Sequence, residues 1–296
     1  MYWQAWCPRE HARAVVVVVH GLHEHSARYT HVGARLAAAG FAVYATDHRG
    51  HGRSDGRRAN IERMTLLQQD LRSFVQFAAE RHPGPVFMVG HSLGGLIALD
   101  YVLSSGVLSS GVLSSGVLRP GVLGSGADTL AGLVLSGPAV TATAGSALAK
   151  RLAPVLSMLV PNLGVASLNA EQKISRDPEV VRAYREDPLV YQGRIKARTG
   201  AEILAVIQRL PAALPRLCVP LLILHGSDDQ ICPLAGSVMV YEAVSSPDKT
   251  LRQYPGLYHE VFNEPERNQI LTDLIGWLND RSRPQSASAA GLPPGG

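Results

Sequence analysis

The pentapeptide Gly-x-Ser-x-Gly, which can hold a nucleophilic serine on a sharp turn between a strand and a helix, occurs twice in the chain. The second copy is Gly90–Gly94, with Ser92 at its centre. A short apolar run over 86–89 precedes it, and an apolar run compatible with a helix follows over 93–99. The first copy, centred on Ser54, lies among histidines, arginines and glycines that are typical of a loop. This context predicts Ser92 as a nucleophile and Ser54 as a chance match.

A serine hydroxyl becomes an effective nucleophile when a histidine takes its proton and a carboxylate orients that histidine. After a strand–serine–helix turn, these partners follow along the chain in the order acid and then histidine. The only histidine beyond residue 225 is His259, which we predict as the base. The acid is expected just after the apolar run 221–224. Asp228 and Asp229 are adjacent there, and spacing alone leaves both open.

Negative charge that develops on the substrate oxygen needs two backbone N–H donors. One is expected from Leu93, the residue after the nucleophile, and the other from the loop 20–25, where Leu22 is the favoured donor. Histidines at positions 20, 23 and 25 of that loop raise the alternative of a metal site. The zinc motif His-Glu-x-x-His is absent, however, since Ala27 stands where its second histidine is required. We therefore expect neither a metal nor another cofactor.

Short apolar runs of strand length recur along the chain and alternate with helical patterns. The strand-like runs cover 14–19, 41–45, 86–89, 130–135 and 221–224, with a weaker one at 251–254. The helical patterns cover 32–39, 64–81 and 93–103. Continuous apolar strands separated by helices predict an α/β fold, with a mostly parallel sheet covered by helices on both faces. Ligands of such sheets bind beyond the carboxyl ends of the strands.

This core is predicted to comprise residues 1–140 and 197–280. Between them, 141–196 lacks the strand rhythm and carries leucines at near-helical spacing, interrupted by Pro154 and ended by Pro161. A helical cap over the strand ends is one interpretation, and an amphipathic segment that only packs on the body is the other. A five-residue repeat (VLSSG, VLSSG, VLSSG, VLRPG, VLGSG) over 102–126 predicts an extruded loop, and 281–296 a disordered tail.

Composition narrows the class of protein. The 296 residues are 46% hydrophobic and 18% charged, which excludes a mainly disordered chain. A net charge of only +4 argues against a nucleic-acid partner. Three scattered cysteines predict no disulfide framework, and the first residues lack the order of a signal peptide. Without an apolar run of about 18 residues, no transmembrane helix is expected, and we predict a cytoplasmic protein.

Several longer motifs carry a family resemblance. His20–Ser26 (HGLHEHS), Asp47–Ser54 (DHRGHGRS) and Gly90–Gly95 (GHSLGG) resemble monoacylglycerol lipases of the α/β-hydrolase superfamily. The segments Ile174–Val181 (ISRDPEVV) and Pro255–Glu264 (PGLYHEVFNE) are especially similar to the mycobacterial branch of that family. The resemblance covers most of residues 2–280. It implies an α/β-hydrolase fold with a helical cap and no cofactor.

Carried over residue by residue, the resemblance implies Ser92 as nucleophile, Asp229 as acid and His259 as base. It also implies the backbone amides of Leu22 and Leu93 as oxyanion donors, and it places Glu24 and Arg28 at the glycerol end of the pocket. Cys232 stands three residues past the acid, where some members of the family have a thiol close to the site.

The chain departs from the family in two places. Tyr2–Trp6 resembles the family's second strand, so the usual first strand is expected to be absent. The repeat over 102–126 replaces a short connection after the nucleophile helix.

The expected activity is hydrolysis of a monoacylglycerol ester to glycerol and a fatty acid through an acyl-enzyme. The apolar cap is expected to receive the acyl chain and to touch a membrane surface. A lysophospholipase or broad carboxylesterase is an alternative, because the same three residues serve each of these reactions. A non-catalytic binding protein with this fold is the alternative from another class.

Overall fold

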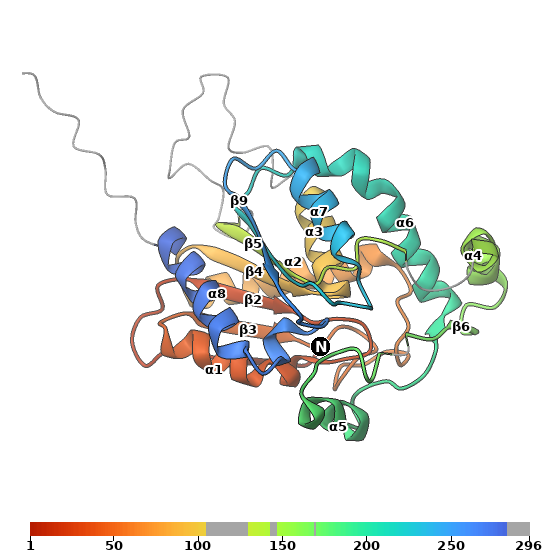
Figure 1. The fold of residues 1–296 in the computed structure, drawn as a ribbon, viewed down its shortest axis with the longest axis horizontal. Helices are drawn as coiled ribbons and strands as arrows, with labels where there is room; N and C mark the ends of the chain where they lie inside the picture. Colours follow the sequence, from red (N-terminus) through yellow and green to blue (C-terminus); the bar gives the residue numbers. More distant parts are fainter. Residues whose placement is uncertain (105–129, 143–146, 169, 283–296) are drawn as a thin grey trace, which may run out of the picture.

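The computed structural model describes residues 1–104, 130–142, 147–168 and 170–282. Within them, seven strands form one sheet in the order β1-β3-β2-β4-β5-β8-β9 (Figure 1). Strand β1 pairs antiparallel with β3 at one edge, and the other pairings are parallel. The strand bounds are β1 Trp3–Trp6, β2 Val15–Val19, β3 Ala42–Thr46, β4 Val86–His91, β5 Gly132–Ser136, β8 Leu221–Gly226 and β9 Lys249–Tyr254.

Helices cover both faces of this sheet. Their bounds are α1 Thr30–Ala38, α2 Met64–Arg81, α3 Leu93–Ser104, α4 Ala147–Leu159, α5 Pro178–Glu186, α6 Ala197–Ala213, α7 Leu234–Ala243 and α8 Arg267–Ser282. Three 3₁₀ turns, η1 Ser26–Tyr29, η2 Leu214–Arg216 and η3 Val261–Asn263, lie between them among the described residues. Helices α1 and α8 lie on one face, and α2, α3, α6 and α7 lie on the other (Figure 1).

The strand β2 shows why the sequence produces this layering. Its five valines are all buried. Val15, Val17 and Val19 pack into the cluster that contains the apolar faces of α2 and α3, whereas Val16 and Val18 pack into the cluster under α1 and α8. A strand that is apolar at every position can lie only where both faces are covered. The six strands predicted from apolar runs are confirmed, as is the mostly parallel α/β architecture.

Residues 141–196, which we call the cap segment, contain α4, α5 and a small antiparallel pair, β6 Gly164–Ala166 and β7 Ile195–Lys196. Helix α5 begins at the sequence signal Asp177-Pro178, where the Asp177 side chain accepts a hydrogen bond from the Glu179 N–H. Helix α4 lies at the periphery, away from the central sheet (Figure 1). Among the described residues, no helix is both long and apolar enough to cross a bilayer.

Three predicted boundaries differ from the structure. The first residues of the repeat are not loop, because Val102 and Leu103 are buried core residues of the last turn of α3. The predicted tail begins too early, since Arg281 still belongs to α8, where its guanidinium stacks on Trp277 and pairs with Asp248. Pro154 does not interrupt the cap helix, because α4 continues through it to Leu159. Residues 105–126 of the repeat and 283–296 of the tail lie outside the described residues.

Candidate active site

The turn after β4 places Ser92 at the carboxyl end of the sheet. Ser92 has a φ of 53°, a left-handed conformation that is unfavourable for a residue with a side chain, and its N–H donates to the Ser136 carbonyl across 2.9 Å. The glycines on either side permit this turn. A Cβ at Gly90 would lie 2.6 Å from the Gly94 carbonyl oxygen, and one at Gly94 would overlap the Val19 carbonyl oxygen. The motif therefore needs glycine for close packing of β4, α3 and β2.

Gly94→Ala should lower the free energy of unfolding by about 3 kcal/mol, because the added methyl group has to displace the backbone of β2. The measurement is chemical denaturation followed by circular dichroism. Gly276→Ala is the matched control, since nothing lies within 4 Å of its Cβ position in helix α8. That control should stabilise the fold by about 0.5–1 kcal/mol, the gain of alanine over glycine in a helix. Equal stability of the two variants would contradict the packing argument.

Strands β8 and β9 bring an aspartate and a histidine to the same edge as Ser92. The Nδ1 atom of His259 lies 2.7 Å from Oδ2 of Asp229, and both side chains are buried. The neighbouring Asp228 is exposed and instead accepts from the Ser227 hydroxyl. The His91 ring, next to Ser92 in the chain, has its centroid 4.7 Å from that of His259. Of the two adjacent aspartates, Asp229 is the one that contacts the histidine.

Backbone groups hold the Asp229 carboxylate in a fixed orientation. Its Oδ1 accepts from the N–H groups of Ile231, at 2.8 Å, and Cys232, at 2.9 Å, and Nε2 of His225 lies 3.3 Å from Oδ2. Burial opposes ionisation of this carboxyl, but His259 and these donors outweigh it and lower its pKa. An ionised Asp229 accepts only, so Nδ1 of His259 carries the proton in that contact. The other nitrogen, Nε2, is then the basic atom of the neutral ring.

Burial also acts on the pKa of His259, which it would lower, but the contact with Asp229 raises that pKa above the ordinary histidine value. The charges of Glu260 and Glu24 add to the rise. His91 behaves in the opposite way: burial, followed by the proximity of His259, lowers its pKa to about 4. Near neutral pH, His259 is therefore the basic imidazole of this pair and His91 is an uncharged neighbour.

The loop after β2 lies against Ser92. A Cβ placed on Gly21 would lie 3.2 Å from the Ser92 Cβ, and Leu22 and Leu93 both line the pocket described below. Glu24 fixes the loop, because its Oε1 accepts from the Gly21 N–H at 2.5 Å and from the Tyr29 hydroxyl at 2.7 Å. The two predicted oxyanion donors are thus on backbone segments next to the serine.

Glu24 and Arg28, both predicted near the glycerol end, belong to a buried charge cluster. Arg28 donates through Nη1 to Glu24, at 2.8 Å, and through Nη1 and Nη2 to the two oxygens of Glu260, at 2.6 and 2.7 Å. Its guanidinium also lies 4.8 Å from the centre of the Tyr184 ring of α5. Burial opposes the charge of Arg28, but the two carboxylates raise its pKa overall. The cluster therefore holds one positive and two negative groups, and Glu24 and Glu260 line the pocket.

The cap segment is hydrogen-bonded to two loops of the site, the one after β2 and the one after β9. His25 Nε2 lies 2.8 Å from Oδ2 of Asp187, directly after α5, and the Tyr191 N–H donates to the His23 carbonyl at 2.9 Å. On the other side, the Glu260 N–H donates to the Ile174 carbonyl at 2.8 Å. Residues of the cap segment thus contact both the loop that carries Leu22 and the loop that carries His259.

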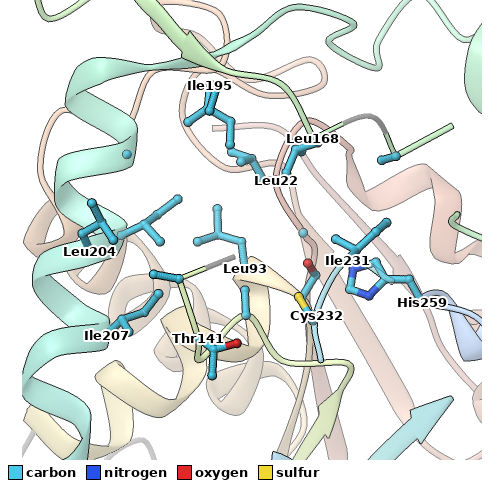
Figure 2. Close-up of a pocket in the computed structure, with 18 of the residues that line it drawn as sticks. Leu22, Leu93, Thr141, Leu168, Ile195, Leu204, Ile207, Ile231, Cys232 and His259 are labelled. Carbon is cyan, nitrogen blue, oxygen red and sulfur yellow. The ribbon is translucent and has the colours of Figure 1, made fainter. Parts of the chain in front are cut away.

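Ser92 and His259 both line a mostly apolar pocket. Figure 2 shows His259, Cys232 and Ile231 on one side of it and Leu204 and Ile207 of α6 on the opposite side. The core and the cap segment both supply its walls. The apolar lining includes Leu22, Leu93, Ala153, Leu156, Leu168, Ile174, Ile195, Ile203, Leu204, Ile207 and Ile231. An apolar pocket lined by the predicted nucleophile and base has the character needed to hold an acyl chain.

The remaining candidate residues are scaffold or neighbours of the site. The Ser54 hydroxyl donates to the Asp47 carbonyl and accepts from the Tyr2 N–H, far along the chain from β4. His20 accepts from the His48 N–H at 2.9 Å, and the described residues contain no cluster of three metal-ligating side chains. Cys232 lines the pocket together with Ser92. Burial, followed by the charge of Asp229, raises the pKa of this thiol, which keeps it protonated.

A mostly parallel sheet with a serine turn after β4, an aspartate after β8 and a histidine after β9 defines the α/β-hydrolase class. The family model described as "Serine aminopeptidase, S33" matches residues 10–266. A monoacylglycerol lipase of Mycolicibacterium smegmatis is 41% identical over 93% of this chain and 91% of its own length. A human monoglyceride lipase is 33% identical over 95% and 88%, respectively.

Solved structures agree with the sequence relatives. The crystal structure of a Paleococcus ferrophilus monoacylglycerol lipase has a TM-score of 0.80 and 30% identity, and it covers 95% of this chain and 98% of its own. A monoglyceride lipase of Saccharomyces cerevisiae, at 22% identity and a TM-score of 0.78, has the same fold. The chain belongs to this serine hydrolase family and, within it, to the monoacylglycerol lipases, as the sequence motifs indicated.

Sequence reasoning missed two parts of the site. Glu260 directly follows His259 and accepts two hydrogen bonds from Arg28. Its position next to the predicted base was the feature of the sequence that could have indicated a role in the site. Helix α6 was not predicted, although it supplies Ile203, Leu204 and Ile207 to the pocket. Its apolar residues at 203, 206, 207 and 210 have helical spacing, which was the signal for it.

Proposed function

We propose that this protein hydrolyses the ester bond of monoacylglycerols and releases glycerol and a free fatty acid. The observation that supports it most directly is the mostly apolar pocket whose lining includes Ser92 and His259. Glu24 lines the same pocket, and its carboxylate suits the hydroxyl groups of a glycerol head. Membership in the monoacylglycerol lipase family supports the same substrate class.

In the proposed mechanism, Ser92 attacks the acyl carbonyl carbon while Nε2 of His259 takes the hydroxyl proton. The amides of Leu22 and Leu93 hold the oxyanion of the tetrahedral intermediate. His259 then gives its proton to the departing glycerol oxygen, which leaves the acyl group on Ser92. A water molecule, deprotonated by His259, attacks this ester, and His259 returns the proton to the Ser92 oxygen as the fatty acid is released. Asp229 orients the imidazole throughout, and the chain's own residues supply each proton transfer.

At the polar end, we propose that Glu24 faces the glycerol head and that Arg28 acts through the carboxylates it holds. The hydrogen bonds of the Arg28 guanidinium go to Glu24 and Glu260, which supports this indirect role. At the other end, Leu204 and Ile207 of α6 supply apolar contacts for the acyl chain.

The pH dependence of the reaction should report His259. The base must be neutral to accept the serine proton, so kcat/KM should fall as the pH drops through the pKa of His259. Asp229 raises that pKa, so we expect the acid limb to be centred above the ordinary histidine value of about 6.5. Initial rates on an uncharged ester between pH 5 and 9 measure the limb. A limb centred well below pH 6 would contradict the assignment of His259 as a base paired with Asp229.

Turnover of 1-monooleoylglycerol, compared with lysophosphatidylcholine and a p-nitrophenyl ester, tests the substrate class. Preferential, Ser92-dependent turnover of the monoglyceride is the expected result. Preferential turnover of lysophosphatidylcholine would make the protein a lysophospholipase, and broad turnover of all three a carboxylesterase. Binding of the monoglyceride without turnover of any ester by the folded protein would indicate a binding protein.

We further propose that α4 touches the lipid phase in which the substrate is dissolved, in a protein located in the cytoplasm. Leu148, Met158 and Leu159 are 66%, 71% and 68% exposed, and Leu152 and Val155 of the same helix are also exposed. The helix contains no acidic residue, and its Ala153 and Leu156 line the pocket. An apolar surface this exposed is typical of an interaction site. The three cysteines are all free, which fits a reducing compartment.

The double change Met158→Ser and Leu159→Ser tests the membrane contact. It should weaken co-sedimentation with phosphatidylcholine vesicles by at least about tenfold, since two apolar side chains leave the interface. Turnover of the water-soluble p-nitrophenyl butyrate should stay at the wild-type level. Unchanged vesicle binding would contradict the proposal. A wild type that elutes as a dimer on gel filtration, with the double variant eluting as a monomer, would also contradict it, because α4 would then be an interface between two copies.

A further inference from the structure

The residue directly after the predicted base is a buried carboxylate with an unusual set of partners. Glu260 is 5% exposed and lies on the wall of the pocket. Both of its oxygens accept from Arg28, and Oε2 also accepts from Asn263 at 2.8 Å. Burying a carboxylate costs free energy unless it is paired and hydrogen-bonded. A glutamate at this position is therefore held by a specific arrangement and is not a surface charge.

From Glu260, an unbroken series of hydrogen bonds reaches the loop beside Ser92. Arg28 links Glu260 to Glu24, and Glu24 accepts from the Gly21 N–H at 2.5 Å. Gly21 directly precedes Leu22, the proposed oxyanion donor. The series thus joins the residue after the base to the residue before the donor, across 239 positions of sequence between Gly21 and Glu260.

Resting on the function proposed above, we propose that Glu260 is a positioning residue. Through Arg28 and Glu24, its carboxylate holds the loop that carries Leu22 in the correct place relative to His259. The donor must contact the carbonyl oxygen while the base contacts the serine hydroxyl that attacks the same carbonyl, and a displacement of about 1 Å is enough to slow such a reaction severely. The loop with Leu22 follows β2 and the loop with His259 follows β9. A rigid link between these loops therefore fixes the distance between Leu22 and His259, which the strands alone leave adjustable.

The same three residues, Glu24, Arg28 and Glu260, also place fixed charges near His259. The groups around His259 are Asp229 in contact with it, His91 beside it, and the carboxylates of Glu260 and Glu24 with Arg28 between them. His225 acts on it through Asp229. The cluster of Glu24, Arg28 and Glu260 has one net negative charge, which favours the imidazolium that forms when His259 takes the serine proton. In agreement with this stabilisation of the imidazolium, Glu260 and Glu24 both raise the pKa of His259, although less than Asp229 does.

Glu260→Gln tests the proposal, because the amide keeps the shape but loses the charge and one of the two contacts with Arg28. We expect kcat on 1-monooleoylglycerol to fall about 10- to 100-fold with little change in KM. The acid limb of kcat/KM should move to lower pH by about half a unit, since removing a negative charge near His259 lowers its pKa. Glu266→Gln is the matched control, because this glutamate is exposed in a surface pair with Arg176. It should behave like the wild type.

Glu260→Asp separates the two effects, since it keeps the charge and shortens the reach to Arg28. We expect this variant to lose kcat while its acid limb stays at the wild-type pH. It also serves if Glu260→Gln does not fold, as judged by thermal unfolding. Wild-type kcat and pH profile in a folded Glu260→Gln or Glu260→Asp would overturn the proposal. Failure of the wild type to hydrolyse any ester would instead overturn the proposed function, so the two failures are distinguishable.

Discussion

Replacing Ser92 by alanine should lower kcat on 1-monooleoylglycerol about a millionfold, since removal of the nucleophile from a serine–histidine pair has an effect of that order. The same variant should no longer be labelled by a fluorophosphonate, which reacts with an activated serine. Ser92 and His259 both line the pocket, and the variant loses only one hydroxyl from it. Labelling followed by gel fluorescence, together with a hydrolysis assay, gives both results.

The chain provides a matched control for this experiment in its other Gly-x-Ser-x-Gly sequence. Ser54→Ala removes the same group from the same motif, but within the described part of the chain that hydroxyl bonds to backbone groups of Asp47 and Tyr2. Labelling should remain complete, with a loss of about 1 kcal/mol in the free energy of unfolding. Persistent labelling of Ser92→Ala, or loss of labelling in a folded Ser54→Ala, would contradict the choice of Ser92.

Asp229→Asn should lower kcat about 10⁴-fold, the effect seen when an amide replaces the acid of such a triad and favours the wrong tautomer of the histidine. The amide can still accept from the N–H groups of Ile231 and Cys232, so the fold should persist. Steady-state kinetics and circular dichroism measure the two quantities.

Asp228→Asn is the control for the adjacent carboxylate. Asp228 is exposed and accepts from Ser227, so we expect its kcat to match the wild type. A large loss of activity in Asp228→Asn, with Asp229→Asn near the wild-type level, would reverse the assignment of the acid.

Sequence reasoning reached most of the core because its signals are local. Five valines in β2 can be buried on both faces only inside a covered parallel sheet, and the strand and helix around Ser92 distinguish it from Ser54. The choice between Asp228 and Asp229 needed the family resemblance. Both follow β8, and only the fold reveals which carboxylate contacts His259.

The cap segment and the charge cluster were less predictable for a physical reason. The pairing of β6 with β7 joins segments about 30 residues apart and involves two or three residues on each side, too few to leave a periodic pattern. A proline such as Pro154 predicts a break in a helix, yet α4 continues through it. Glu260 is an ordinary glutamate in the sequence, and its role depends on Arg28, which lies 232 residues away.

The bonds from the cap segment to the loops of His23, His25 and Glu260 have a consequence for how the protein fails when heated. The sheet is stabilised by two large apolar clusters, whereas the part of the cap segment around α5 is held by hydrogen bonds, ion pairs and a much smaller apolar cluster. Local unfolding frees such a region at a lower free-energy cost than it frees a core strand. Fraying of the segment around α5 would release both loops together, so activity should be lost at a temperature where the sheet is still intact.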